Sequence, residues 1–248
     1  MVGRFLEFYK NSLEFIRNRY SDLRLQELAG DPRRYLSIAF TQQKNGLILR
    51  RLIKGKRVLI IGSGPSATEL SRIPNDVLIF TCNAGVNLLA SKNLGRKMDF
   101  YFCNAEKIIK KAVVDALRAV KTNVFMTTDI QAVEQLSILS NSCSRLMLYD
   151  QIHKNFSWSW AKKYGYISRK TVSTGLRLLQ YALYFKASEI YIIGVDLGEG
   201  RYFWGQDKKQ KHFGSDTNFI DAALRSHGRI YSLSPNSPLT HRLPQKSF

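Results

Sequence analysis

The chain has 248 residues, enough for one sizeable α/β domain with a small extension. Hydrophobic residues make up 44% of it, which supplies a core and excludes a largely disordered chain. No apolar run reaches the roughly 18 residues of a membrane-spanning helix. Arg4, Glu7 and Lys10 interrupt the stretch that would be apolar in a signal peptide, so we expect a cytoplasmic protein.

The formal net charge of +19 is spread along the whole chain. Such a field attracts polyanions, which include nucleic acid, an anionic membrane surface and a phosphorylated glycolipid. The charge alone does not choose among these partners.

The first 55 residues form an extension that differs from the rest of the chain. Its apolar residues recur at spacings of three and four, the pattern of an amphipathic helix, at Phe5, Tyr9, Leu13, Ile16, Tyr20 and Leu23. Gly30-Asp31-Pro32 ends this pattern, and several arginines make the segment basic. We expect either a helix packed on the main domain or a helix on a membrane surface.

From residue 56 onward, short apolar runs alternate with helical patterns, which predicts an α/β fold with a mostly parallel, Rossmann-like sheet and helices on both faces. The strand candidates are Arg57–Ile61, Val77–Thr81, Asp99–Cys103, Asn123–Thr127, Arg145–Tyr149, Glu189–Ile193 and Arg229–Leu233. The helical candidates are Ala84–Asn93, Glu106–Val120, Asp129–Leu139, Ser173–Phe185 and Thr217–His227. Ligands of such sheets bind beyond the carboxyl ends of the strands, so the residues after each strand are candidate site residues.

The first strand runs into a glycine loop, Gly62-Ser63-Gly64-Pro65-Ser66. Glycines allow a tight turn and a close approach to a ligand, and Ser66 can cap a helix whose N-terminus favours an anion. The loop is therefore a candidate nucleotide-binding loop, with a purely structural turn as the alternative. Pro65 within the loop, and Asn83 where a dinucleotide fold usually has an acidic residue, oppose the dinucleotide pattern.

Polar residues follow several other strands or open the helix before one. Asn83 and Asn104 end the second and third strands, where two amides can grip a ribose, a base edge or a sugar. Ser173-Thr174-Gly175 opens a helix and suits a phosphate or base contact, or serves as an ordinary cap. Asp196 ends Gly194-Val195-Asp196 after the sixth strand, and Ser237 ends Ser234-Pro235-Asn236-Ser237 after the seventh.

The sequence offers no recognisable metal-ligand spacing. Its three cysteines and four histidines are scattered, at Cys82, Cys103, Cys143, His153, His212, His227 and His241. We therefore expect buried, reduced thiols and no bound metal. No Asp-x-Asp occurs, which favours a metal-free mechanism over one that uses a metal–diphosphate. His212 lies in the polar loop 201–214 after the sixth strand and is the best-placed candidate base.

In order along the chain, these motifs resemble the bacterial lipooligosaccharide sialyltransferases, glycosyltransferase family forty-two. The resemblance covers about residues 56 to 239. Its motifs are Gly62–Ser66, Ile73-Pro74-Asn75-Asp76, Cys82-Asn83, Phe102-Cys103-Asn104, Ser173-Thr174-Gly175, Glu189-Ile190-Tyr191, Gly194-Val195-Asp196 and Ser234-Pro235-Asn236-Ser237. The extension, residues 1–55, lies outside it, so the expected division is 1–55 and a single-domain, GT-A-like variant at 56–248.

The resemblance implies an inverting, metal-independent transfer from CMP-sialic acid, with no cofactor besides the donor substrate. It implies that Ser63 and Gly64 lie against the donor phosphate, that Asn83 and Asn104 hold donor hydroxyls, and that Thr174 and Gly175 contact the nucleotide. The family uses two tyrosines to stabilise the leaving phosphate. One of them matches Tyr202, and the other falls at Gly198. The family's catalytic histidine follows a longer loop than the one before His212.

Several alternatives stay open at this point. Asp196-Leu197-Gly198 also resembles transferases of the lipopolysaccharide core that use CMP-activated Kdo. Either sugar would go to an anionic glycolipid, and the enzyme would lie at the inner membrane surface. A homo-oligomer stays open beside a monomer. A different nucleotide-dependent enzyme, such as a pyrophosphokinase-like one, is the first rival. A basic nucleic-acid-binding protein is the second, although no recognisable nucleic-acid-binding motif is present.

Overall fold

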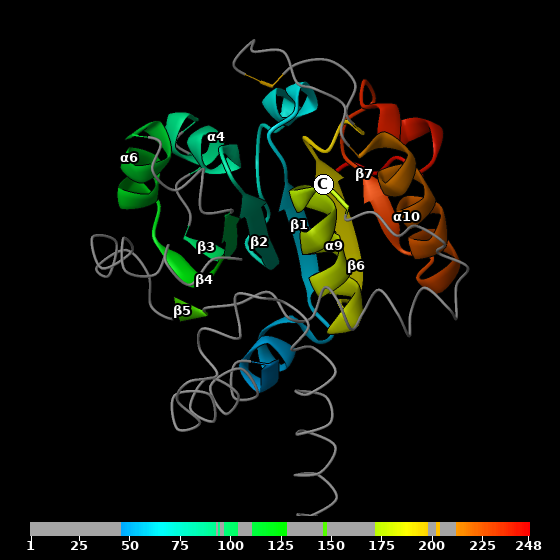
Figure 1. Cartoon of the computed structure of the whole chain (residues 1–248), viewed down its shortest axis with the longest axis horizontal. Coiled ribbons are helices and arrows are strands. Elements are labelled where there is room, and N and C mark those ends of the chain that lie inside the picture. The colour runs from blue at the N-terminus through cyan, green and yellow to red at the C-terminus, as the bar shows by residue number, and fades with distance from the viewer. Residues whose placement is uncertain are drawn as a thin grey trace, which may run out of the picture. The chain divides into compact units, whose positions relative to one another are not determined.

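The computed structural model describes residues 46–92, 94, 97–103, 111–127, 146–147, 172–197, 202–203 and 212–248 (Figure 1). The chain divides into two compact units, residues 1–46 and 47–248. Several predicted features lie outside the described residues. They are the N-terminal amphipathic stripe, the helix Asp129–Leu139, most of the loop 201–214, Asn104, Cys143, His153 and Gly198. The predicted domain division at residue 55 stays a prediction.

In the described part of the chain, seven strands form one sheet in the order β5-β4-β3-β2-β1-β6-β7, and each pairing between neighbours is parallel. The strands are β1 Arg57–Ile61, β2 Val77–Cys82, β3 Met98–Cys103, β4 Thr122–Thr127, β5 Leu146–Met147, β6 Glu189–Ile193 and β7 Ile230–Ser232. In register, Ile61 lies opposite both Thr81 of β2 and Ile193 of β6. The predicted parallel α/β sheet is thereby confirmed.

Helices cover both faces of this sheet, as the alternating pattern predicted (Figure 1). They are a helix at 46–53, the 3₁₀ turn η1 Pro65–Glu69, α4 Gly85–Ser91, α6 Lys111–Ala119, α9 Thr174–Tyr184, α10 Phe213–Ser226 and the 3₁₀ turn η3 Pro238–His241. None of the helices in the described ranges combines the length and the apolar character that a bilayer crossing requires.

Two hydrophobic cores lie on opposite faces of the sheet because successive side chains of a strand point to opposite sides. Val58 and Ile60 of β1 pack with helix 46–53, α9 and α10. Leu59 and Ile61 pack with η1, α4 and α6. Strands buried on both faces are apolar along their whole length, which is why β1 appears in the sequence as an unbroken apolar run.

Helix α10 begins at Phe213, four residues before the predicted start at Thr217. The reason is the backbone of His212, whose carbonyl oxygen accepts hydrogen bonds from Asp216 N (2.8 Å) and from Ser215 Oγ (2.9 Å). Asp216 then lies in the first turn, where a carboxylate interacts favourably with the helix dipole. The prediction relied on apolar residues at helical spacing, and Gly214 in this turn does not belong to that pattern.

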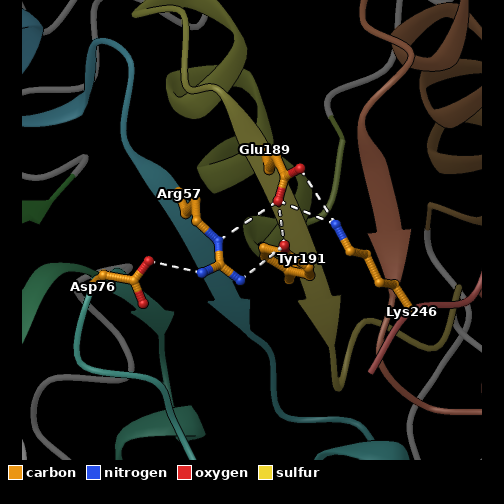
Figure 2. A network of polar contacts seen from close by, with 5 residues as sticks. All are labelled: Arg57, Asp76, Glu189, Tyr191 and Lys246. Atoms are coloured by element: carbon orange, nitrogen blue, oxygen red, sulfur yellow. Dashed lines mark hydrogen bonds and ion pairs between the residues drawn. The ribbon is translucent and has the colours of Figure 1, made fainter. Parts of the chain in front are cut away.

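A network of polar side chains lies at the amino ends of β1 and β6 (Figure 2). Arg57 pairs with Asp76 (2.7 Å) and donates to the hydroxyl of Tyr191 (3.0 Å), which in turn donates to Glu189. Lys246 approaches the same carboxylate at 3.3 Å. The hydroxyl of Tyr191, with Lys246 and Arg57 beside it, holds the pKa of the Glu189 carboxyl below its ordinary value.

We predict that Glu189→Gln lowers the melting temperature by about 3–6 °C at pH 7, because a hydrogen-bonded carboxylate is lost from a site only 22% exposed. A lowered pKa in the folded state means that the carboxylate stabilises the fold above the unfolded-state pKa and stops doing so as the pH falls through the folded-state pKa. Thermal unfolding at pH 7 and pH 3.5 should therefore show the difference shrinking at low pH.

The control is Asp76→Asn, which removes a carboxylate that is 63% exposed and should change the melting temperature much less. A Glu189→Gln protein that melts with the parent at pH 7 would contradict this account of the network.

Candidate functional site

The candidate site lies where the chain changes direction across the sheet, at the carboxyl ends of β1 and β6 (Figure 1). Strands β2 to β5 lie on one side of β1, and β6 and β7 lie on the other side. Open α/β sheets bind their ligands at such a switch point. Here the loops after the two strands are joined by hydrogen bonds from Gly62 N to Ile193 O (2.8 Å) and from Gly64 N to Gly194 O (2.7 Å).

The glycines of these loops are required by the close approach of the two backbones. A Cβ atom at Gly62 would overlap the carbonyl of Gly194, and one at Gly64 would overlap the carboxylate of Asp196. Gly194 itself has a φ of +72°, a left-handed conformation that favours glycine. The protein's own packing therefore explains the glycine pattern, whether or not a ligand also lies against the loop.

The carboxylate of Asp196 joins the loops after three strands. Its Oδ2 accepts from Ser66 N (3.0 Å), and its Oδ1 accepts from Ser66 Oγ (2.5 Å) and Ser237 Oγ (2.8 Å). Ser66 Oγ also accepts from Gly194 N (2.9 Å). All three side chains are buried, so these predicted site residues lie together and bind one another.

The segment that carries Tyr202 lies against the glycine loop. Phe203 N donates to the carbonyl oxygen of Ser63 (3.1 Å), and Tyr202 and Ser63 are each partly buried. Pro65 is exposed at the start of η1. The structure thus places Ser63, Pro65 and Tyr202 on the rim of the buried cluster around Asp196.

Asn83 occupies the corner after β2, next to the end of β3. Its φ of +48° is left-handed, a conformation that asparagine tolerates better than most residues. Asn83 N donates to Phe102 O (3.0 Å), and the Tyr101 hydroxyl donates to Asn83 O (2.8 Å). Burial raises the pKa of Tyr101 well above its ordinary value, so this hydroxyl stays protonated and can donate.

Helix α9 begins close to the same edge. Gly175 packs against Val195, the residue before Asp196, closely enough that a Cβ at Gly175 would meet a Val195 methyl group at 2.8 Å. Ser173 is the N-cap, without a side-chain cap hydrogen bond, and Thr174 is the first helical residue. Ser173 N donates to Asp216 Oδ1 (2.7 Å), which ties the start of α9 to the first turn of α10.

His212 lies at the N-cap of α10 and is partly buried. Because Asp216 bonds both to the His212 carbonyl and to Ser173 N, the candidate base lies within one helical turn of the contact with α9. His227, in contrast, ends α10, and burial together with Arg229 lowers its pKa. His241 is exposed at the end of η3.

The sequence analysis missed two residues that lie near the carboxyl ends of the strands. Asp216 is not among the candidate site residues of the sequence analysis, yet it connects α9 with α10. Arg177 lies in the first turns of α9, with its Cζ 5.8 Å from the centroid of the Phe102 ring. The available signal was that Arg177 is the one charged residue of a helix that is otherwise apolar or neutral.

No group of three or more histidine, cysteine, aspartate or glutamate side chains that could hold a metal ion occurs within the part of the chain that is described. The groups that converge are amides, hydroxyls and a buried carboxylate already engaged with three donors. Cys82 and Cys103 are buried free thiols, as predicted.

The fold is similar to that of solved sialyltransferases. The sialyltransferase CstII from Campylobacter jejuni, in complex with the substrate analogue CMP-3FNeuAc, matches with 22% identity and a TM-score of 0.53, over 77% of this chain and 86% of that one. Sialyltransferase CST-II in complex with a trisaccharide acceptor and CMP matches with 21% identity and a TM-score of 0.53, over 77% and 86%. Both matches agree with the resemblance that the motifs indicated.

The monofunctional alpha-2,3-sialyltransferase Cst-I from Campylobacter jejuni matches with 17% identity and a TM-score of 0.52, over 77% of this chain and 80% of that one. No family model matches the sequence, and no curated protein matches it either. Identities at this level establish the shared fold.

We predict that Asp196→Asn lowers the melting temperature by about 4–8 °C, because an amide turns a donor toward Ser66 or Ser237 and leaves a buried hydrogen bond unmade. Thermal unfolding measures the effect. The matched control is Asp221→Asn, whose carboxylate is 38% exposed in an ion pair with Arg242 and should matter little. Equal melting of the Asp196 variant and the parent would refute the role of this carboxylate.

Proposed function

We propose that this chain is a glycosyltransferase that moves an acidic sugar, sialic acid or Kdo, from a CMP-activated donor to a lipooligosaccharide or lipopolysaccharide acceptor, with inversion and without a metal ion. One observation carries the proposal. The loops after β1 and β6 and the start of α9 meet at the switch point, in a fold similar to structures solved with CMP. The candidate base is tied to α9 through Asp216.

The donor phosphate, in this proposal, lies against the rim of the glycine loop. The amides of Gly62, Gly64 and Ser66 already donate within the protein, which makes partly buried Ser63 the loop residue best placed to donate to phosphate. The buried residues Ser66, Asp196 and Ser237 act as positioning residues that hold the loop in shape. The start of α9, at Thr174 and Gly175, offers backbone N–H groups to the nucleotide.

The sugar, in this proposal, extends from the phosphate toward the corner after β2, where Asn83 and Asn104 hold its hydroxyls. The reaction breaks the bond between the anomeric carbon and the phosphate oxygen, whose electrons leave with CMP. The acceptor oxygen attacks the opposite face of that carbon, which inverts its configuration, and its proton passes to His212. N–H and O–H groups, including the Tyr202 hydroxyl, stabilise the charge that develops on the leaving phosphate.

The protein's charge favours the proposed substrates. A net charge of +19 raises the local concentration of an anionic donor and of a phosphorylated lipid acceptor. The basic extension of residues 1–55 is proposed as the part that approaches an anionic membrane surface on its cytoplasmic side.

We predict that CMP stabilises the folded protein against heat and that NAD, ADP and UDP do so much less. A ligand present at about 100 times its Kd adds about 2.7 kcal/mol, which raises the melting temperature by several degrees. A thermal-shift series with the four nucleotides measures this. An equal shift with NAD would move the chain to another class of enzyme.

We predict that donor hydrolysis or transfer continues in EDTA, because the proposed reaction uses no metal ion. Loss of activity in EDTA that magnesium restores would contradict this prediction.

We predict that His212→Ala lowers kcat by about a hundredfold or more while CMP affinity stays nearly unchanged, because general-base catalysis typically contributes about 10²–10⁴ in rate. The cap of α10 should survive, since the His212 backbone carbonyl, and not its side chain, accepts from Asp216 N and Ser215 Oγ. The control is His241→Ala, which changes an exposed histidine outside the site. Turnover by the His212 variant at the parental rate would end its assignment as the base.

A further inference from the structure

Helix 46–53 has one side toward the core and one side toward solvent. Its buried residues Leu49 and Ile53 belong to the same core as the buried residues of α9. Lys54 N donates to Arg50 O (3.0 Å), so the helical turn continues to Lys54. Four exposed residues share the solvent side, at helical spacings of three, four and seven: Leu47, Arg50, Arg51 and Lys54.

The turn after α9 lies beside the end of this helix. Gly55 N donates to Lys186 O (2.9 Å), and Ser188 N donates to Lys56 O (2.8 Å). Lys56 and Lys186 are exposed as well. Because these segments precede β1 and β6, they lie at the amino ends of the strands, the end opposite the candidate site (Figure 1). We define the basic face as the five exposed cations Arg50, Arg51, Lys54, Lys56 and Lys186.

The basic face carries charge that the described part of the chain does not neutralise. None of its five side chains forms an ion pair or a hydrogen bond with a described residue. The carboxylate of Glu189, next to this turn, interacts with Arg57 and Lys246 instead. Like charges four residues apart on a helix, such as Arg50 and Lys54, repel each other. An anionic partner would relieve that repulsion.

Two large apolar side chains lie among these cations. Leu47 is 57% exposed, and Tyr184, two residues before Lys186, is 50% exposed. The Tyr184 ring stands edge-on to the buried ring of Phe185, with their centroids 5.0 Å apart. Leucine and tyrosine beside lysine and arginine are typical of a surface that enters the headgroup region of a bilayer.

We propose that the basic face, together with Leu47 and Tyr184, is a docking surface for an anionic membrane, an inference that goes beyond sugar transfer and does not depend on it. Anionic headgroups would neutralise the cations, while the interface takes up the leucine and the tyrosine. Charge complementarity selects this occupant. A second copy of the chain, with its net charge of +19, or the net basic segment 1–45 would bring more positive charge to the face.

Docking through the basic face has a consequence for the proposed reaction. The candidate site lies at the other end of β1, and five strand residues measure about 17 Å. A soluble donor would then enter the site without competing with the membrane. A lipid-linked acceptor would reach the site only through a glycan that extends at least about this far from the bilayer.

The test measures how the full chain binds sedimented vesicles of phosphatidylcholine that contain about 30% phosphatidylglycerol. Each cation near such a surface contributes about fivefold in affinity. We therefore expect the triple variant Arg50→Gln, Arg51→Gln, Lys54→Gln to weaken vesicle binding by about 10–100-fold. Leu47→Ala should weaken vesicle binding by about threefold and leave binding to duplex DNA unchanged, because only the bilayer takes up an apolar side chain.

The matched control removes three exposed cations in and just after α6, which packs on the opposite face of the sheet: Lys111→Gln, Arg118→Gln and Lys121→Gln. It should bind vesicles within about threefold of the parent, since these cations lie outside the basic face. Melting temperature and CMP affinity should stay at the parental values in both triple variants. A chain that binds no CMP would overturn the proposed function and leave this inference standing.

Four outcomes would overturn the inference. They are a parent that ignores anionic vesicles, a triple variant of the basic face that binds them like the parent, equal losses in both triple variants, and a loss of affinity for duplex DNA alone. The last would identify a nucleic-acid surface. If the triple variant of the basic face does not fold, Lys56→Gln with Lys186→Gln replaces it. We expect that pair to weaken vesicle binding by about fivefold or more, and unchanged binding would overturn the inference.

Discussion

The close approach of the backbones after β1 and β6 is the constraint on which the rest of the site depends. Gly62 and Gly64 donate to carbonyls of the opposite loop, and neither position has room for a Cβ. With the loops this close, the buried Asp196 carboxylate can reach Ser66 on one side and Ser237 on the other. A single carboxylate thus holds three loops in place, and the rim formed by Ser63, Pro65 and Tyr202 lies on this buried cluster.

The sequence predicted the sheet well because strands buried on both faces are apolar runs of limited length, and β1 and β6 match their predicted ranges completely. Helix α10 began earlier than predicted because a backbone cap at His212, and no apolar period, starts it. Asp196 was recognisable as a strand-end residue, but its partners were not, since Ser66 and Ser237 are remote in sequence. The left-handed backbone at Asn83 was equally hidden, although it offers a structural reason for that asparagine.

The carboxylates at the amino ends and at the carboxyl ends of the strands are stabilised in different ways. At the amino edge, Glu189 interacts with Lys246 and Arg57 and accepts from the Tyr191 hydroxyl. At the carboxyl edge, Asp196 accepts from a backbone amide and two hydroxyls. Dipoles fixed by the fold stabilise a buried carboxylate without bringing a cation into the loop cluster. They also reduce the repulsion that Asp196 would exert on a nearby phosphate, and the overall charge of +19 opposes what remains.

The second buried carboxylate, Asp216, couples two parts of the site that are far apart in sequence. It accepts from Ser173 N at the start of α9, and its own amide bonds to the His212 carbonyl at the start of α10. A displacement of α10 would therefore move the candidate base and strain the contact with α9 together. Since α9 also packs against Val195 through Gly175, the same displacement would reach the loop that carries Asp196. The spacing between His212 and the start of α9 is thus set by hydrogen bonds and packing contacts, which would give the proposed transferase one defined geometry for attack on the donor.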